Sequence, residues 1–279
     1  MTRTSTDRAA RRRAGFTLAG IALALVAVLA VIAGLIVAHD LGSPRPNPAT
    51  PASSTAPTSG TAPHVEPTSP PTDDTAAAEA ALAQRPMLQL PVQAAQPQAL
   101  TTQTTGSPIT IPAPTQTVGR WIPGGFPDTP EGALGQLAAL DETAINGGDP
   151  QVYATGYRQT SEPGAPAAAT TGVYGVLAAM RARAGLAATG PVDGLSVTYQ
   201  VDAAQIKGTA ANGYAVVCVL GELSIGWQGQ MIAAGMGDCQ AMTWTGTQWQ
   251  IAPGVLAALA PNAWPGSANA VAAGYRAVS

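Results

Sequence analysis

Residues 195–202 read Leu-Ser-Val-Thr-Tyr-Gln-Val-Asp, and apolar residues alternate with polar residues through the whole run. A period of two predicts a β-strand with one buried face and one solvated face. The dipeptide at 212–213, Asn-Gly, predicts a turn into a second strand at 214–223. Two further strands follow, so the stretch 195–251 predicts a four-stranded antiparallel sheet.

The middle hairpin of this sheet predicts a pairing between the two cysteines. Its centre is the dipeptide at 228–229, Gln-Gly, and pairing outward from that turn sets Cys218 opposite Cys239. Gly235 and Gly237 leave open a bulge that would shift the register. The hairpin therefore predicts adjacent cysteines, provided that no bulge intervenes.

The last hairpin predicts an aromatic pair. Its tip, Gly-Thr at 246–247, suits a type II′ turn because the first central position there needs a positive φ. This turn sets Trp244 opposite Trp249 and Met242 opposite Ile251. Cross-strand aromatic pairs contribute roughly 0.2–1 kcal/mol beyond an Ala pair.

Three helices are predicted before the first strand. The first begins at Thr129 as N-cap, with Pro130 at the first helical position and Glu131 near the positive end of the helix dipole. Its buried stripe consists of Ala133, Leu137, Leu140 and Ala144. The second begins at Asp149, and the third covers about 171–186.

After the last strand, a helical turn at 253–260 and a short helix at 267–278 close the chain. Residues 119–279 are long enough to form one core. The element order predicts an α+β domain, in which three helices pack on one face of a curved four-stranded antiparallel sheet.

A membrane anchor is predicted near the amino terminus. Residues 14–38 are uncharged and mostly apolar, which is enough to cross a bilayer with some tilt. The preceding tail, 1–13, holds five arginines and one acid, so the positive-inside rule keeps it in the cytoplasm and exports the rest. A cleaved signal peptide, with Ile-Val-Ala at 36–38 as the cleavage site, is the alternative. Either route predicts a domain that works outside the cytoplasm, and the anchor predicts a single-pass cell-membrane protein.

Residues 39–118 are rich in Pro, Thr, Ser and Ala and predict a disordered stalk. Within it, 74–84 has helix-forming composition, which predicts a marginal helix. Two short apolar patches, 87–91 and 109–112, either dock on the domain or belong to the stalk. Composition favours the stalk.

The two cysteines, Cys218 and Cys239, have three possible roles: a disulfide, a metal pair or a nucleophile. An oxidising exterior and the predicted pairing favour the disulfide. A zinc site would need more ligands, and a nucleophile would need a base, but both histidines, His39 and His64, lie outside the domain. We therefore expect no metal and no cofactor.

Acidic residues provide the remaining candidates for catalysis. They are Asp128, Glu131, Asp141, Glu142, Asp149 and Glu222. Three of them lie at predicted helix N-termini, and Asp141 and Glu142 are expected on a solvated helix face. Glu222 lies inside an apolar strand, where it either lines a cavity or faces outward. Structural roles are favoured for each, so we expect no enzyme.

The chain carries a net charge of −3, and its domain has no basic patch, which argues against direct contact with nucleic acid.

The pattern of three helices and a four-stranded sheet on a single-span anchor resembles the extracytoplasmic assembly subunits of conjugative type IV secretion systems, including the Gram-positive conjugative-transposon transfer proteins. The run 125–141, beginning Gly-Phe-Pro-Asp-Thr-Pro-Glu-Gly-Ala, is similar to membrane-anchored proteins of actinobacterial mobile elements, as are 205–208 and 218–223. This resemblance implies a cone-like fold of the nuclear-transport-factor type and a scaffold without catalytic residues. The expected partners are proteins of an envelope complex, including further copies of the chain.

A ligand-binding or cell-envelope module is the alternative function. Cone folds enclose apolar pockets, and four aromatic residues of the strands offer a lining. The candidate pocket or interaction surface consists of Trp227, Trp244, Trp249, Tyr199 and Glu222. Aromatic residues at strand period are more often core, so a filled core would favour the scaffold. An isomerase or dehydratase of the cone-fold type is a third, weaker reading, because only acids are available as bases.

Overall fold

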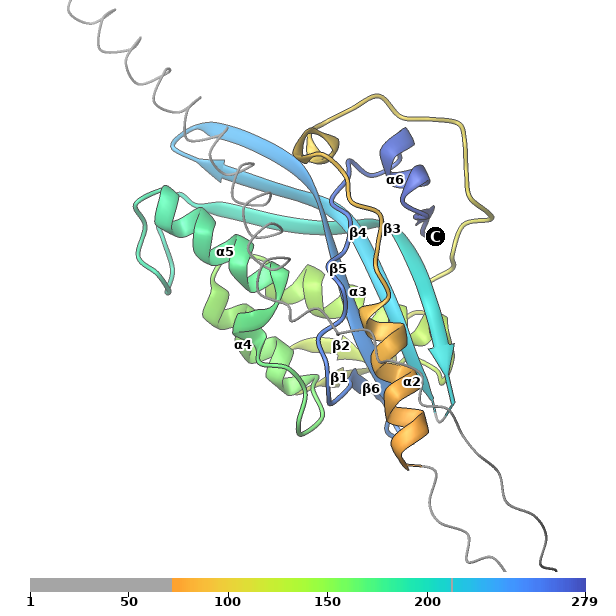
Figure 1. The fold of residues 1–279 in the computed structure, drawn as a ribbon. Coiled ribbons are helices and arrows are strands. Elements are labelled where there is room, and N and C mark those ends of the chain that lie inside the picture. Colours follow the sequence, from red (N-terminus) through yellow and green to blue (C-terminus); the bar gives the residue numbers. More distant parts are fainter. Residues whose placement is uncertain (1–71, 212) are drawn as a thin grey trace, which may run out of the picture.

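A five-stranded antiparallel sheet forms the centre of the structure (Figure 1). The computed structural model describes residues 72–211 and 213–279. The strands follow the spatial order β6-β5-β4-β3-β7. They are β3 (Ser196–Ala210), β4 (Tyr214–Trp227), β5 (Gln230–Trp244), β6 (Trp249–Ile251) and β7 (Arg276–Ala277). The predicted α+β class is confirmed, but the sheet has a fifth strand, β7, which the sequence pattern missed.

Five α-helices and a second, small sheet complete the described chain. The α-helices are α2 (Thr72–Gln84), α3 (Pro130–Ala144), α4 (Pro150–Gln159), α5 (Gly172–Arg183) and α6 (Ala268–Ala272), and the 3-10 helices are η1 (Val92–Ala95) and η2 (Ala168–Thr170). The small antiparallel sheet pairs β1 (Gln116–Val118) with β2 (Ile122–Gly124).

The predicted register of the hairpins is confirmed. Gln228 and Gly229 both have positive φ, 51° and 76°, as a type I′ turn requires. Pairing from this turn is uninterrupted and places Cys218 opposite Cys239. In the last hairpin Trp244 lies opposite Trp249, with ring centroids 5.6 Å apart.

Gly235 produces no bulge, and its role is close approach of another segment. A Cβ built on Gly235 would lie 1.7 Å from the backbone oxygen of Ala263, so only glycine lets that segment cross the strand. The register shifts lie instead on β3, between Val201 and Ala203 and between Ile206 and Gly208. Two such irregularities bend the strand and increase its twist.

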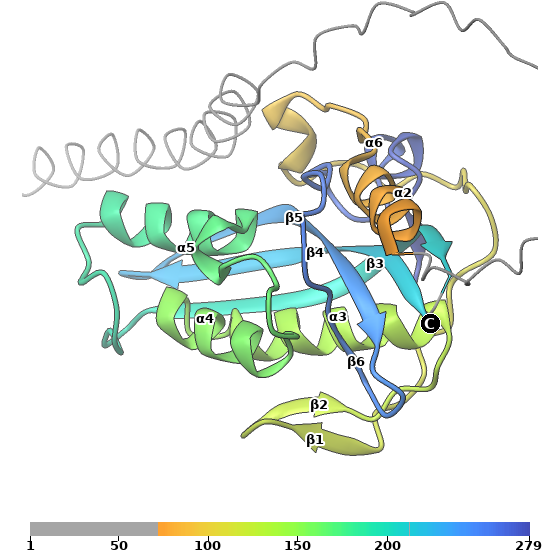
Figure 2. The same ribbon diagram turned by 60° about the horizontal axis from the view of Figure 1, so that its bottom comes forward.

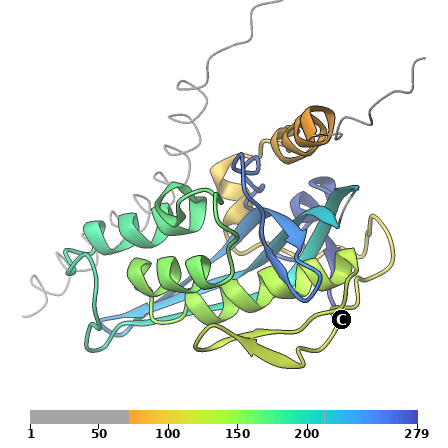
Figure 3. The ribbon, with the colours of Figure 1, turned by 90° about the horizontal axis from the view of Figure 1, so that it is seen from below.

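One face of the sheet, here called the helical face, is covered by α3, α4 and α5. α3 packs across β3 and β4, and the three helices lie side by side (Figure 3). Their starts are those predicted: the side chains of Thr129 and Asp149 accept hydrogen bonds from the N–H groups of Gly132 and Gln151. Apolar residues of the helices and the sheet form one core cluster, which includes Leu134, Leu137, Leu177, Val217 and Val219.

The other face, here called the strap face, is covered by irregular chain and short helices. Figure 2 shows α2, α6 and the segment around η1 on the side of the sheet opposite to α3. Apolar side chains from these segments form a second core cluster with β4 and β5. That cluster includes Ala83, Tyr214, Val216, Cys218, Leu220, Ala263 and Tyr275. The sheet is therefore a middle layer with a core on each side.

The prediction that the disordered stalk extends to residue 118 is wrong for 72–118. α2 packs on β3, and Ala83, Ala94 and Ile109 are buried. The backbone of 109–111 hydrogen-bonds to the last strand, with Ile109 N donating to Ala277 O at 2.8 Å. The composition of 72–118 predicted disorder because the stretch has few large apolar residues of its own. Its order comes from the apolar surface of the sheet that it covers. Both apolar patches dock on the domain: 109–112 through these bonds, and 87–91 through Met87 and Leu90, which pack against the strap-face cluster.

The predicted closing elements also differ. No helix forms at 253–260, and the helix expected at 267–278 is limited to α6, after which the chain turns into β7. Gly274, with φ 90°, permits this turn. Pairing of β7 with β3 outweighs helix propensity in the last residues.

The cytoplasmic tail (1–13), the membrane helix (14–38) and the first part of the stalk (39–71) lie outside the described residues. Within 72–211 and 213–279, no helix is long and apolar enough to cross a membrane.

Candidate functional site

The five residues expected to form a pocket or interaction surface do not converge. Trp244 and Trp249 pack against each other with tilted rings near one end of the β4–β5 hairpin, whereas Trp227 adjoins the turn at the other end. Trp249 is buried, and its indole Nε1 donates to Pro127 O at 2.8 Å. Tyr199 is buried on the helical face, and its hydroxyl donates to Met236 O at 2.8 Å. Three of the four aromatic residues therefore fill and brace the core.

Glu222 lies half-buried at a shallow hollow of about 400 Å³ on the strap face. The hollow runs between β3, β4 and the segments 100–104 and 264–266. Glu222 accepts a hydrogen bond from Ser224 Oγ at 2.7 Å. Asp202 lines the same hollow, and burial followed by the charge of Glu222 raises its pKa. Glu222 does line a hollow, but without the aromatic residues.

Cys218 and Cys239 form a disulfide across β4 and β5, on the strap face. Their Cα atoms lie 4.1 Å apart, and the bond spans a sequence separation of 21. Because the chain has only two cysteines, neither a thiolate nucleophile nor a cysteine metal site remains. Closing such a loop stabilises a fold by about 3 kcal/mol in the chain-entropy model. Among the residues that the structure describes, no three His, Cys, Asp or Glu side chains cluster to hold a metal ion.

The prediction that Asp141 and Glu142 face solvent is wrong. Asp141 is 0% exposed, because α3 packs against the sheet, α4 and the β1–β2 hairpin. Glu142 is half-buried, and its Oε1 accepts from the backbone N–H of Val201 at 2.8 Å. The sequence held a signal for Asp141, which lies four residues after Leu137 and therefore borders the buried stripe.

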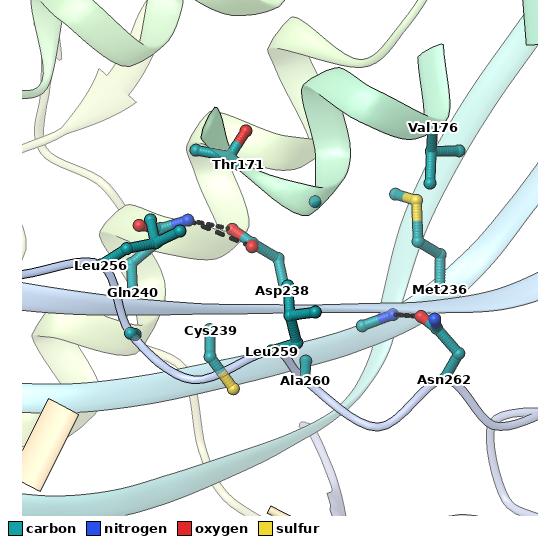
Figure 4. Close-up of a pocket in the computed structure, with 13 residues that line it drawn as sticks. Thr171, Val176, Met236, Asp238, Cys239, Gln240, Leu256, Leu259, Ala260 and Asn262 are labelled. Atoms are coloured by element: carbon teal, nitrogen blue, oxygen red, sulfur yellow. Dashed lines mark hydrogen bonds between the residues drawn. The ribbon is translucent and has the colours of Figure 1, made fainter. Parts of the chain in front are cut away.

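Asp238 on β5 is the second buried acid of the helical face, and sequence reasoning missed it. Its carboxylate accepts two hydrogen bonds from Gln240 Nε2, at 2.9 and 3.1 Å (Figure 4). The backbone N–H of Cys239 also hydrogen-bonds to it. The confirmed register pairs Asp238 with Val219, a residue of the helical core, so the register itself was the signal.

The two buried acids influence each other electrostatically. Burial, then the charges of Asp238 and Glu142, raises the pKa of Asp141 well above its usual value. Burial raises the pKa of Asp238 to about 6, although its hydrogen bonds oppose the shift. Neither carboxylate oxygen of Asp141 has a hydrogen-bond partner within the described residues. An unpaired buried carboxylate is costly, so Asp141 favours its protonated form.

A small cavity of about 50 Å³ lies beside Asp238 at the outer edge of β5 (Figure 4). One wall is the start of α5, with Thr171 and Val176, and the facing wall is the segment 256–262. Most of its lining is apolar, and Asp238 is the one carboxylate in that lining.

Part of the outer edge of β5 has no strand beside it. The short Cα separation of the cysteine pair marks a non-hydrogen-bonded position, so odd-numbered residues of β5 turn their backbone groups away from β4. Ala241 O is satisfied by Ala252 N, and Gly237 N by Asn262 Oδ1, both at 2.8 Å. For Met231 and Ala233, no atom of the described chain bonds to the backbone on that side.

Comparison with known protein families, with curated proteins and with solved structures finds no match for this chain. Any function proposed for it depends on its own sequence and geometry.

Proposed function

We propose that the protein is a single-pass membrane protein whose exported domain is a non-enzymatic assembly module that binds a protein partner at the tip of the β4–β5 hairpin. The observation that carries the proposal is the open outer edge of β5 at Met231 and Ala233. An exposed strand edge offers unpaired N–H and C=O groups, to which an extended segment of a partner adds as a further strand.

The other edges of the sheet are occupied by the protein's own chain. On β6, Ile251 N donates to Thr160 O at 2.7 Å, and on β7, Ala277 O accepts from Ile109 N at 2.8 Å. Beside the first half of β3, the side chains of Asn146 and Glu142 accept from the backbone N–H groups of Tyr199 and Val201. Because soluble proteins protect strand edges, an edge left open within an otherwise protected sheet supports a contact role.

Side chains at the same tip fit a protein contact. Met231 is 69% exposed, and it is one of four large hydrophobic residues exposed in the described chain. Trp227 and Ile232 are half-buried at the same end of the hairpin, and Ile232 packs against the helical-face core. Met and Trp residues are enriched at protein interfaces. Of the residues predicted as an interaction surface, Trp227 is the one that this proposal keeps.

The partner is a component of a conjugative transfer apparatus of the type IV secretion kind, or a further copy of the chain in such a complex. Support comes from the resemblance of 125–141, 205–208 and 218–223 to mobile-element proteins, and from the anchor sequence at 14–38. A scaffold role also agrees with the positions of Tyr199 and Trp249, which are buried in the helical-face core cluster.

The test is crosslinking and co-purification of the full-length protein from its native membrane, with mass spectrometry of what accompanies it. Ala233→Pro removes an outward-facing N–H, a position where an edge strand tolerates proline. Gln228→Gly is the matched control, because it changes the same hairpin at a residue with φ 51° but leaves the edge intact.

We expect the wild type and Gln228→Gly to retain transfer-machinery subunits and Ala233→Pro to lose them. Recovery of a cell-wall polymer alone would replace the scaffold with the envelope-binding alternative. Equal recovery of partners by Ala233→Pro would show that the open edge is not the contact surface.

A further inference from the structure

The cavity beside Asp238 combines a buried carboxylate with apolar walls and an opening at the edge of the sheet. Asp238 is 5% exposed, and its side chain projects between the start of α5 and the segment 256–262 (Figure 4). Val176, Met236, Leu256 and Leu259 supply apolar lining. Asn262 supplies an amide from the facing wall, and its Oδ1 is held by Gly237 N.

Among the described residues no basic side chain pairs with the two acids, because the buried guanidinium of Arg181 on α5 donates instead to the backbone oxygens of Gly148, Ala187 and Gly190. Within residues 72–211 and 213–279, no lysine or arginine nitrogen is recorded as an ion-pair partner of Asp238 or Asp141. Asp141 is completely buried with both oxygens unpaired and favours its protonated form, so Asp238 is the acid that presents a negative charge to the cavity. A buried carboxylate is stabilised by a cation that reaches hydrogen-bonding distance.

The size of the cavity limits the ligand. A volume of about 50 Å³ accommodates roughly four water-sized groups, at about 10–15 Å³ each. An ammonium group on a chain of about three carbons matches this size, with the charge at Asp238 and the carbons against the apolar walls.

We propose that the β5-edge cavity is a binding site for the primary ammonium group of a small alkylamine, with Asp238 as its counter-ion, Gln240 holding that carboxylate in place and the walls from α5 and 256–262 enclosing the carbon chain. The site is independent of the hairpin tip, because it depends on side chains on the helical face of β5 and not on the open backbone edge.

Gln240 holds the carboxylate of Asp238 in one orientation. Its Nε2 donates to both oxygens of Asp238, and its Oε1 lies 3.5 Å from the hydroxyl of Tyr157. These contacts leave the remaining lone pairs of the carboxylate for a ligand, since each oxygen accepts more than one hydrogen bond. A neutral molecule of the same shape would lack the charge-assisted bond.

Affinity for the amine should rise with pH, because the ammonium pairs with ionised Asp238 and the pKa of this carboxyl lies at about 6. Titratable groups that act on Asp238, or are acted on by it, come from α3, α4, β3 and the C-terminal segment. They are Asp141, Tyr153, Tyr157, Tyr199 and Tyr275. Burial raises the pKa of each tyrosine, so none of them ionises near pH 6.

The test is saturation-transfer NMR on the full-length protein, titrated with n-propylammonium chloride and, separately, with n-propanol as the neutral analogue. We expect the amine to bind saturably with a Kd of about 1 mM, which is reasonable for a ligand of this size. We expect no binding of the alcohol. Asp238→Asn should weaken binding about tenfold or more, because it removes a charged hydrogen-bond partner. Asp193→Asn, at an exposed acid on another loop, is the matched control and should bind as the wild type does.

A second variant keeps the test decisive if Asp238→Asn does not fold. Val176→Trp fills the cavity from α5 without altering the acid, and it should also abolish amine binding. An intact Cys218–Cys239 disulfide and an unchanged circular dichroism spectrum would show that each variant is folded. Absence of saturable amine binding by the wild type, or equal binding by Asp238→Asn, would overturn the assignment. Either result leaves the co-purification test of the hairpin tip unaffected.

Discussion

The helical face and the strap face of the sheet bury similar side chains but are covered in different ways. On the helical face, Leu137 lies on a regular helix with a capped start. On the strap face, Leu220 is equally buried, but beneath a cover of short helices and irregular chain. The comparison teaches that a core layer does not need periodic sequence, because apolar surface on one side of a contact is enough to order a weakly apolar segment on the other.

The largest expected effect is a loss of stability on truncating one buried leucine on each face, which tests whether the helical face and the strap face are covered equally well. Leu137→Ala and Leu220→Ala each remove a fully buried side chain, so each should lower the free energy of unfolding by about 4 kcal/mol. Chemical denaturation of the two variants measures this. A disordered stalk at 72–118 would leave Leu220 partly open, and its replacement would then be much less costly.

Hydrogen exchange provides the control for that comparison. Amides of α2 and the N–H of Ile109, which bonds to Ala277 O, should be protected in the wild type and lose protection in Leu220→Ala before α3 does. Rapid exchange throughout 72–118 in the wild type would show that the strap face is not covered.

An intermediate effect distinguishes the faces by their response to pH, because the acids with the largest upward shifts lie on the helical face. The pKa of Asp238 is about 6 when folded and near 3.8 when unfolded, so the folded state holds its proton more tightly. The resulting stability is fully present below about pH 4 and is lost as pH rises through 6. The loss is about 2–3 kcal/mol at 1.36 kcal/mol per pKa unit.

Asp238→Asn should therefore flatten the pH dependence and make the domain more stable than the wild type at pH 8. Denaturation midpoints measured from pH 4 to pH 8 test this expectation. Asp193→Asn, in an exposed loop, should reproduce the wild-type curve. Parallel curves for the wild type and Asp238→Asn would mean that Asp238 is ionised at no cost in the folded protein.

The smallest expected effect compares one helix cap from each face. Thr129 Oγ1 accepts from Gly132 N at 3.1 Å at the start of α3, and Ser267 Oγ accepts from Ala270 N at 3.3 Å at the start of α6. Replacing either with alanine should cost about 1 kcal/mol. Thermal unfolding of the two variants measures the difference. A negligible cost for Ser267→Ala would show that the strap face depends on packing rather than on its short helix.

Local chemistry explains what was predictable from the sequence. Gln228-Gly229 and Gly246-Thr247 set the registers of two hairpins, and these registers led directly to the disulfide and the tryptophan pair. Thr129 and Asp149 marked helix starts that the structure confirms. In each case a few neighbouring residues determine the backbone geometry, so no distant contact is needed to predict it.

The buried acids were not predicted because their environment is created by distant segments. Asp141 lies on α3 and Asp238 on β5, and each becomes buried only when helix and sheet pack together. Asp141 borders the buried stripe of α3, and the contact of α3 with the sheet decides that it is buried rather than solvated. The proposed amine site follows from that packing, because the walls outside 236–240 come from α5 and from the segment 256–262.

By itself the sequence determined the α+β class, the hairpin registers, the cysteine pairing and the starts of α3 and α4, because turns and caps act over a few residues. Only the tertiary structure decided that 72–118 joins the domain, that β7 completes the sheet and that Asp141 and Asp238 share a buried layer. The physical reason is that burial is a property of two surfaces in contact. A segment with few apolar residues becomes ordered, and an acid becomes desolvated, only through the surface that another part of the chain presents to it.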